Sequence, residues 1–152
     1  MRRGRRGFVG ALCAAAAGLA LPAAASTPLV EVWKAPTCGC CQDWIHHLQA
    51  HGFRVQVHDV GNSAARARLG IPMALGSCHT ALVGGYAIEG HVPARDIRRL
   101  LAERPQAIGL AVPGMPVGSP GMDGPEYGAR KDPYDVLLVQ PGGRSSVWQS
   151  YR

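Results

Sequence analysis

Three cysteines crowd one short segment of this sequence. In KAPTCGCCQDW, Cys38, Cys40 and Cys41 fall within four positions, between an apolar run and the expected start of a helix. Free backbone amides and the helix dipole favour thiolates at such a position. Thiols that are so close together form a disulfide, act as a redox couple or bind a soft metal. Much later in the chain, Cys78 stands directly before His79.

Four chemistries account for these residues to different extents. A C-x-x-C redox centre uses Cys38 and Cys41 and leaves Cys40, Cys78 and His79 idle. Two structural disulfides would have to involve the adjacent pair Cys40 and Cys41, which demands unusual geometry. Structural zinc usually takes its ligands from two separated knuckles rather than from neighbouring residues. Cu(I) fits best, because this soft ion prefers thiolate ligands. The metal-free redox centre stays the alternative.

Four further side chains are candidates for an extended site. Met115 and Met122 lie in a glycine- and proline-rich stretch, and a thioether is a soft ligand for Cu(I). They are candidates for capping the site, or they fill an apolar gap. His91 is a candidate ligand or a hydrogen-bonding partner of one. His47 shares a helix face with His51 and is a candidate for a second site.

The elements that must position these residues follow from hydrophobic periodicity and turn residues. Gly84-Gly85 indicates a tight hairpin turn, and Gly52 is typical of a helix end. The predicted order is a strand over 28–35, a helix over 40–51, a strand over 53–60, a helix over 63–69, a hairpin over 79–90 and a helix over 93–103.

This order predicts an α/β protein with a thioredoxin-like fold, in which helices cover a small mixed sheet. A helical crossover joins the first two strands, so they should be parallel. In thioredoxin-like proteins the loop before the hairpin faces the active cysteines. Counting back from Gly84-Gly85 places Cys78 and His79 in that loop. We therefore expect both residues to face the cysteine segment.

The segment 104–133 differs in character from the rest of the chain. Glycine and proline make up 12 of its 30 residues, and its periodicity disappears, so it is predicted to be a long loop. A loop of this length favours a lid over the site. Beyond it, YDVLLV and SSVWQSY predict a C-terminal β-hairpin. Residues 26–152 are expected to form a single domain.

The N-terminus has the pattern of an export signal. Residues 1–25 contain a basic start, an apolar core and small residues in A-x-A spacing, and Arg5-Arg6 resembles a twin-arginine signal. Cleavage would place the protein in the periplasm with no membrane segment. It would remove four of the 16 Lys+Arg, leaving 12 against 10 Asp+Glu, a formal charge of +2 in place of +6. This balance gives no support to nucleic-acid binding.

Taken together, the sequence resembles the CopG-type periplasmic copper-resistance proteins, a putative metal-binding family. The matching segments are PTCGCCQDWIHHL, GIPMALGSCHTALVGGYAIEGHVPA, GLAVPGMPVGSPGM and YDVLLV. The resemblance implies a thioredoxin-like fold and a role in copper tolerance by storage, delivery or Cu(I)/Cu(II) conversion. It also implies that copper, as one ion or as a multinuclear cluster, is bound by Cys38, Cys40, Cys41, Cys78 and His79. Other periplasmic copper-handling proteins are the expected partners.

Overall fold

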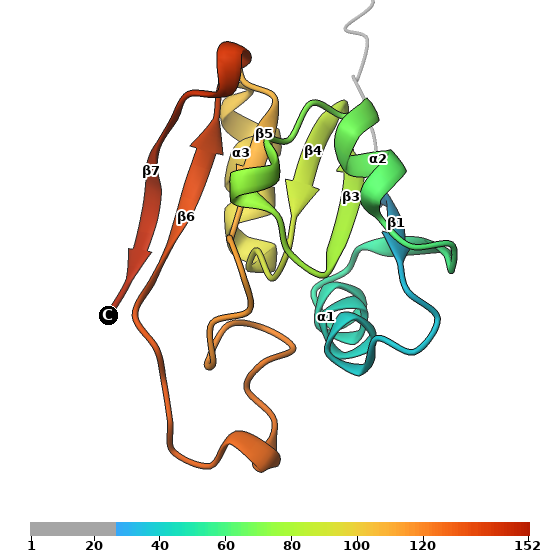
Figure 1. Ribbon diagram of the computed structural model, residues 1–152, viewed down its shortest axis with the longest axis vertical. Helices are drawn as coiled ribbons and strands as arrows, with labels where there is room; N and C mark the ends of the chain where they lie inside the picture. Colours follow the sequence, from blue (N-terminus) through green and yellow to red (C-terminus); the bar gives the residue numbers. More distant parts are fainter. Residues whose placement is uncertain (1–26) are drawn as a thin grey trace, which may run out of the picture.

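A computed structural model describes residues 27–152, so the predicted signal peptide lies outside the described residues. Seven strands form one mixed sheet in the order β2-β1-β3-β4-β5-β6-β7 (Figure 1). In chain order, the strands and α-helices are β1 (Leu29–Lys34), α1 (Gly39–Ala50), β2 (Arg54–His58), α2 (Ser63–Arg68), β3 (His79–Val83), β4 (Tyr86–Glu89), α3 (Ala94–Glu103), β5 (Gly109–Ala111), β6 (Tyr134–Val139) and β7 (Ser145–Tyr151). Short 3-10 turns occur at η1 (Met73–Leu75), η2 (Pro125–Tyr127) and η3 (Pro141–Gly143).

The first half of the chain forms the elements that the sequence predicts. β1 pairs with β2 in parallel, as a helical crossover requires, and β3 and β4 form an antiparallel hairpin. β3 also lies antiparallel to β1, with Lys34 opposite His79. This register brings the start of β3 beside the end of β1, where the cysteine segment begins.

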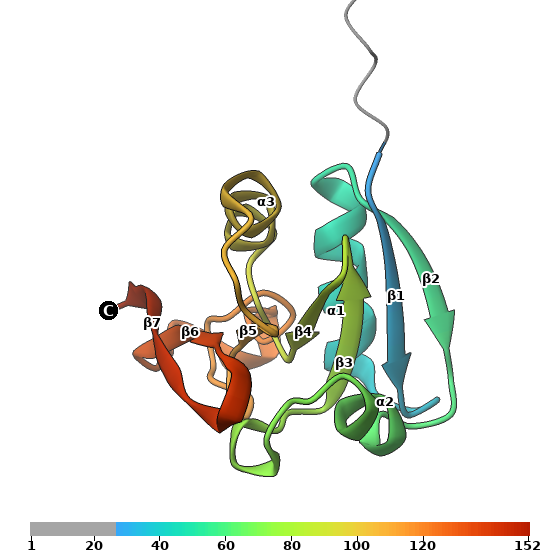
Figure 2. The ribbon, with the colours of Figure 1, turned by 90° about the horizontal axis from the view of Figure 1, so that it is seen from above.

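Strand β5 corrects the prediction of one continuous loop over 104–133. Gly109–Ala111 pair in parallel with β4 and antiparallel with β6. A Cβ atom on Gly109 would lie 1.7 Å from the carbonyl oxygen of Ala87, so only glycine permits this approach. Because β5 joins β4 to β6, the C-terminal hairpin extends the main sheet. Figure 2 shows β2 and β7 at opposite ends of that sheet.

The core is formed by α1 and α3 against the sheet. Trp44 and Leu48 of α1 and Ile97 of α3 are fully buried against residues such as Val32 of β1. These positions recur at helical and strand spacing, which explains why both periodicities are visible in the sequence. None of the helices within residues 27–152 combines the length and the apolar character needed to cross a membrane.

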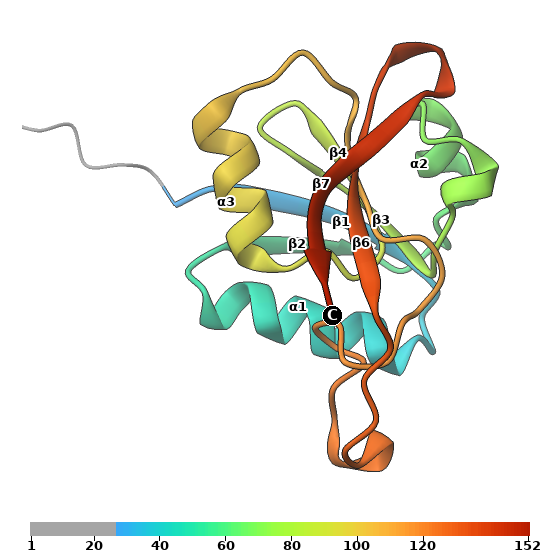
Figure 3. The ribbon, with the colours of Figure 1, turned by 90° about the vertical axis from the view of Figure 1, so that its left-hand side faces the viewer.

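The C-terminal hairpin is tied to α3 by polar and aromatic contacts. The Tyr151 hydroxyl donates to Asp96 over 2.5 Å and packs against Tyr134, with ring centroids 4.6 Å apart. The Arg99 guanidinium lies 4.0 Å from the ring centroid of Trp148. Figure 3 shows the loop between β5 and β6 extending past α1, at the end of the β6–β7 hairpin that lies away from its turn.

Candidate metal centre

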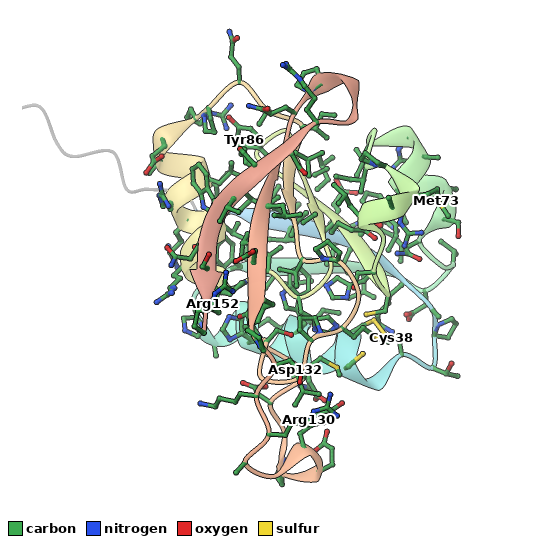
Figure 4. The ribbon with its side chains drawn as sticks, turned by 60° about the vertical axis from the view of Figure 1, so that its left-hand side comes forward. Cys38, Met73, Tyr86, Arg130, Asp132 and Arg152 are labelled. Carbon is green, nitrogen blue, oxygen red and sulfur yellow. A yellow bond between two sulfur atoms is a disulfide. The ribbon has the colours of Figure 1, made fainter. Side chains whose placement is uncertain are left out.

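Four sulfur atoms from two distant segments meet at the start of α1. Cys38 and Cys41 form a disulfide, and the Cys40 Sγ lies 3.7 Å from the Cys38 Sγ. The Cys78 Sγ, at the start of β3, lies 3.8 Å from the Cys40 Sγ. All four sulfurs are within 4.8 Å of one another. The expectation that Cys78 faces the cysteine segment therefore agrees with these distances. Figure 4 shows sulfur atoms gathered around Cys38.

Two imidazoles complete a second ligand group around Cys78. The Cys78 Sγ lies 3.4 Å from His79 Nδ1 and 3.1 Å from His91 Nε2. The Pro120 carbonyl accepts a hydrogen bond from His91 Nδ1 over 2.9 Å. In a neutral ring this leaves the His91 Nε2 lone pair directed at the thiol. Cys78 thus belongs to an all-sulfur group and to a nitrogen-sulfur group.

His79 is fully buried, and one of its nitrogens has no partner. Its ring packs on Trp44 with centroids 4.3 Å apart, and its Nε2 makes no hydrogen bond within residues 27–152. Burial lowers the pKa of His79 well below its ordinary value of 6.5, and burial also lowers the pKa of His91. Both rings are therefore neutral at pH 7, which is the form that ligates a metal. The donor set fits a soft or borderline metal ion.

The Cys78 thiol is held in its protonated form by its surroundings. Burial, followed by the neighbouring Cys40, raises its pKa to about 12. At neutral pH a cation must displace this proton before it can bind the thiolate. An empty pocket therefore does not accumulate negative charge on Cys78.

A buried ion pair fixes the peptide that carries Cys78. The Arg66 Nε donates to Glu89 Oε1 over 2.8 Å, and the Ser77 N–H donates to the same oxygen over 2.7 Å. The Arg66 Nη2 donates to the Ser77 carbonyl over 2.5 Å. Burial raises the pKa of Glu89, while donors from Thr80, Ser77 and Arg66 oppose this shift. With three donors on one carboxylate, we assign the ionised form at pH 7.

The predicted lid lies against the start of α1. Gly121 has a φ of +85°, and a Cβ atom there would lie 2.6 Å from the Cys40 carbonyl oxygen. Met122 is buried, and its Sδ accepts a hydrogen bond from the Tyr127 hydroxyl over 3.4 Å. Met115, the other candidate cap, is 51% exposed. The loop therefore covers the site, with one methionine inside and one at the surface.

His47 lies apart from the sulfur cluster. Its Nε2 accepts a hydrogen bond from the Ala94 N–H at the start of α3 over 3.1 Å, and its ring contacts His51. Burial lowers its pKa. Among residues 27–152 it belongs to neither of the two ligand groups. Its contacts place it at the junction of α1 and α3.

Sequence reasoning did not find the residues that support Cys78. Arg66 lies in a short helix, where an arginine is usually exposed, yet it is 8% exposed, and Glu89 is completely buried. Glu89 ends a strand that is buried on both faces. A carboxylate at such a position signals an internal partner, but the sequence does not say which cation supplies it.

Comparisons with known proteins agree with this geometry. A family model described as a protein of unknown function, DUF411, matches residues 75–122. None of the curated proteins compared with the chain matches it. A solved structure of copper resistance protein CopG, Form 2, is 46% identical, with a TM-score of 0.77 over 84% of this chain and 100% of its own. Form 1 of the same protein is 47% identical, with a TM-score of 0.76 over 83% of this chain and 98% of its own.

The chain belongs to the CopG copper resistance protein family. The DUF411 match covers Cys78, His79 and His91 and the part of the lid up to Met122, but not the cysteines at the start of α1. The two structural matches extend over 84% and 83% of the chain. Membership in the family therefore rests on the two structural matches.

Proposed function

We propose that this protein binds Cu(I) between the start of α1 and the start of β3, on a thioredoxin-like scaffold, and acts in periplasmic copper tolerance. The observation that carries the proposal is the position of Cys78, whose Sγ belongs to both ligand groups. Thiolate selects Cu(I), and a shared sulfur suits a bridge between two ions. The copper resistance described for the solved CopG relatives supports copper as the cargo.

Four thiolates and two neutral imidazoles would provide the ligands once the disulfide is reduced. Cys38, Cys40, Cys41 and Cys78 supply sulfur, and His79 supplies nitrogen. We add His91 to this set because its Nε2 lies 3.1 Å from the Cys78 Sγ. Met122 lies in the loop that covers these residues and is the better-placed candidate for a thioether cap.

The Cys38–Cys41 disulfide supports a redox role for the same pocket. Two Cu(II) ions could each take one electron from the reduced pair. The two thiols would then lose two protons, one S–S bond would form, and two Cu(I) ions would result. Thiol-disulfide exchange with a dithiol donor would then break the Cys38–Cys41 bond and restore the two thiols, leaving the S–S bond on the donor. Buffering and delivery of copper begin with bound Cu(I), and the conversion would produce it.

The test is an anaerobic titration of the reduced protein with Cu(I) against a coloured Cu(I) chelator. We expect more than one Cu(I) per chain, because the two ligand groups share Cys78. Cys78→Ser should abolish the bridge and reduce the stoichiometry, and His79→Gln should weaken binding. His46→Gln, on the exposed face of α1, is the matched histidine control and should change neither. One equivalent or fewer would remove the multinuclear site, and no uptake would remove the copper function.

A metal-free thiol-disulfide oxidoreductase is the second candidate, favoured by the disulfide at the start of α1. Such an enzyme needs Cys38 and Cys41 alone. It should reduce a protein disulfide, such as those of insulin, equally well after Cys78→Ser or His79→Gln. Reductase activity that is unchanged in both variants, together with no Cu(I) uptake by the wild type, would favour the oxidoreductase.

A further inference from the structure

Two of the exposed large apolar side chains are methionines in segments that lead to the candidate metal centre. Met73 is 78% exposed and Met115 is 51% exposed, whereas Met122 is 8% exposed. Met73 lies in η1, on the chain that leads into Cys78, and Met115 lies at the start of the lid. In Figure 4, Met73 lies at the surface on the same side of the view as Cys38. We name this pair the thioether rim.

Hydrogen bonds hold the two parts of the thioether rim together beside Cys78. The Gly76 N–H donates to the Met73 carbonyl over 3.0 Å, and the Gly114 N–H donates to the Gly76 carbonyl over 3.1 Å. The Ser77 hydroxyl donates to the Gly114 carbonyl over 2.5 Å. Residues one position from Cys78 and one position from Met115 are therefore in direct contact.

Arg66 connects the Met73 thioether to the peptide before Cys78. Its Nη1 lies 3.9 Å from the Met73 Sδ, and its Nη2 donates to the Ser77 carbonyl. The sulfur is thereby oriented close to the Cys78 segment. The positive charge of this guanidinium is paired with Glu89 at 2.8 Å. A cation that approaches Met73 is therefore not opposed by an unpaired charge on Arg66.

We propose that the thioether rim, Met73 and Met115, is a surface site that takes up Cu(I) first and passes it to Cys78. A thioether is a soft ligand that carries no proton, so it can bind Cu(I) without acid-base chemistry. In the transfer, a Cu–thioether bond breaks as a Cu–thiolate bond to Cys78 forms, and the thiol proton passes to water. This proposal rests on the proposed Cu(I) function and assigns it an uptake route.

The test measures the rate of loading separately from its extent. Reduced protein is mixed anaerobically in a stopped-flow instrument with Cu(I) supplied as its acetonitrile complex, and thiolate-to-copper absorbance reports transfer. Met73→Leu and Met115→Leu preserve size and apolar character while removing the sulfur. We expect the double variant to load about tenfold more slowly, with the single variants in between, and the final copper content to stay that of the wild type.

The control is Val60→Leu, an apolar change at a side chain that is 80% exposed and lies outside the rim. It should load at the wild-type rate. A double methionine variant whose loading rate is within about twofold of the wild-type rate would contradict the proposal that the thioether rim takes up Cu(I) first. If the wild type itself takes up no Cu(I), the proposed function fails instead, so the two failures are distinguishable. Thermal unfolding of each variant establishes that a slower rate does not come from loss of structure.

Discussion

Cys78 is the residue on which the candidate site depends most. It is the only thiol among residues 27–152 that contributes to both ligand groups, and its peptide is held by the buried Arg66–Glu89 pair. Its raised pKa keeps it protonated until a cation arrives. Binding should therefore release protons, so Cu(I) affinity should increase with pH.

The two buried imidazoles make a prediction about pH and stability. Burial lowers the pKa of His79 well below 6.5 and lowers that of His91 in the folded protein. Below pH 6.5 the unfolded chain binds protons that the folded chain does not bind. The free energy of unfolding of the metal-free protein should therefore fall as the pH drops below 6.5, by up to about 1.4 kcal/mol per pH unit for each histidine.

Urea denaturation on both sides of pH 6.5 measures this slope. His91→Gln should reduce the slope by the contribution of one group, since one fewer buried base is protonated on unfolding. His46→Gln, at an exposed position, should leave the slope as it is. A stability that does not change with pH below 6.5 would contradict neutral burial of these rings.

At the level of elements, antiparallel pairing of β1 with β3 brings the candidate ligands together. It places His79 opposite Lys34, four positions before Cys38. This convergence could be predicted from the sequence because a glycine turn fixes where β3 ends, and a short strand then fixes where it begins. The contact between His91 and Cys78 could not be assigned, since it depends on how the Pro120 carbonyl orients the ring.

Strand β5 shows where sequence periodicity fails. Three residues are too few to display an alternating pattern, and the segment that follows β5 is rich in glycine and proline. The strand exists because Gly109 permits close backbone contact with β4. That requirement is a property of the neighbouring strand and is invisible in the local sequence. The terminal hairpin was therefore predicted correctly, but the sequence did not indicate which strand of the sheet it joins.

The lid gives a prediction at this scale. Gly121→Ala should lift the lid from α1, because the new Cβ would meet the backbone of Cys40 and Trp44 at 2.6 Å and 2.7 Å. We expect a loss in the free energy of unfolding of about 2 to 4 kcal/mol, from positive φ and from the clash together. The free thiols Cys40 and Cys78 should also react faster with a thiol reagent.

Gly128→Ala is the matched control for this change. Gly128 also has positive φ, at +58°, but a Cβ atom there has no atom within 4 Å. It should show only the backbone cost of about 1 to 2 kcal/mol, with thiol labelling at the wild-type rate. Equal labelling of both variants would mean that the lid does not protect the site.

For the whole molecule, copper and folding should be coupled. The ligands come from α1, β3 and the segment after β4, so an unfolded chain does not present them together. Saturating Cu(I) should therefore stabilise the reduced protein, by about 4 kcal/mol at a thousandfold excess over the dissociation constant. Thermal unfolding with and without Cu(I) measures this effect. An unchanged midpoint would show that Cu(I) does not select the folded state.

The disulfide has a consequence for how much copper the molecule can carry. The disulfide uses the sulfurs of Cys38 and Cys41 at the start of α1. It leaves two free thiols, Cys40 and Cys78, whose Sγ atoms are 3.8 Å apart. An oxidised molecule thus keeps the two free thiols and the imidazoles of His79 and His91 as candidate donors, while a reduced one offers all four sulfurs as well. With Cu(I) as the proposed cargo, oxidation of Cys38 and Cys41 would therefore lower the number of sulfur ligands, and with it the amount of copper that the molecule holds.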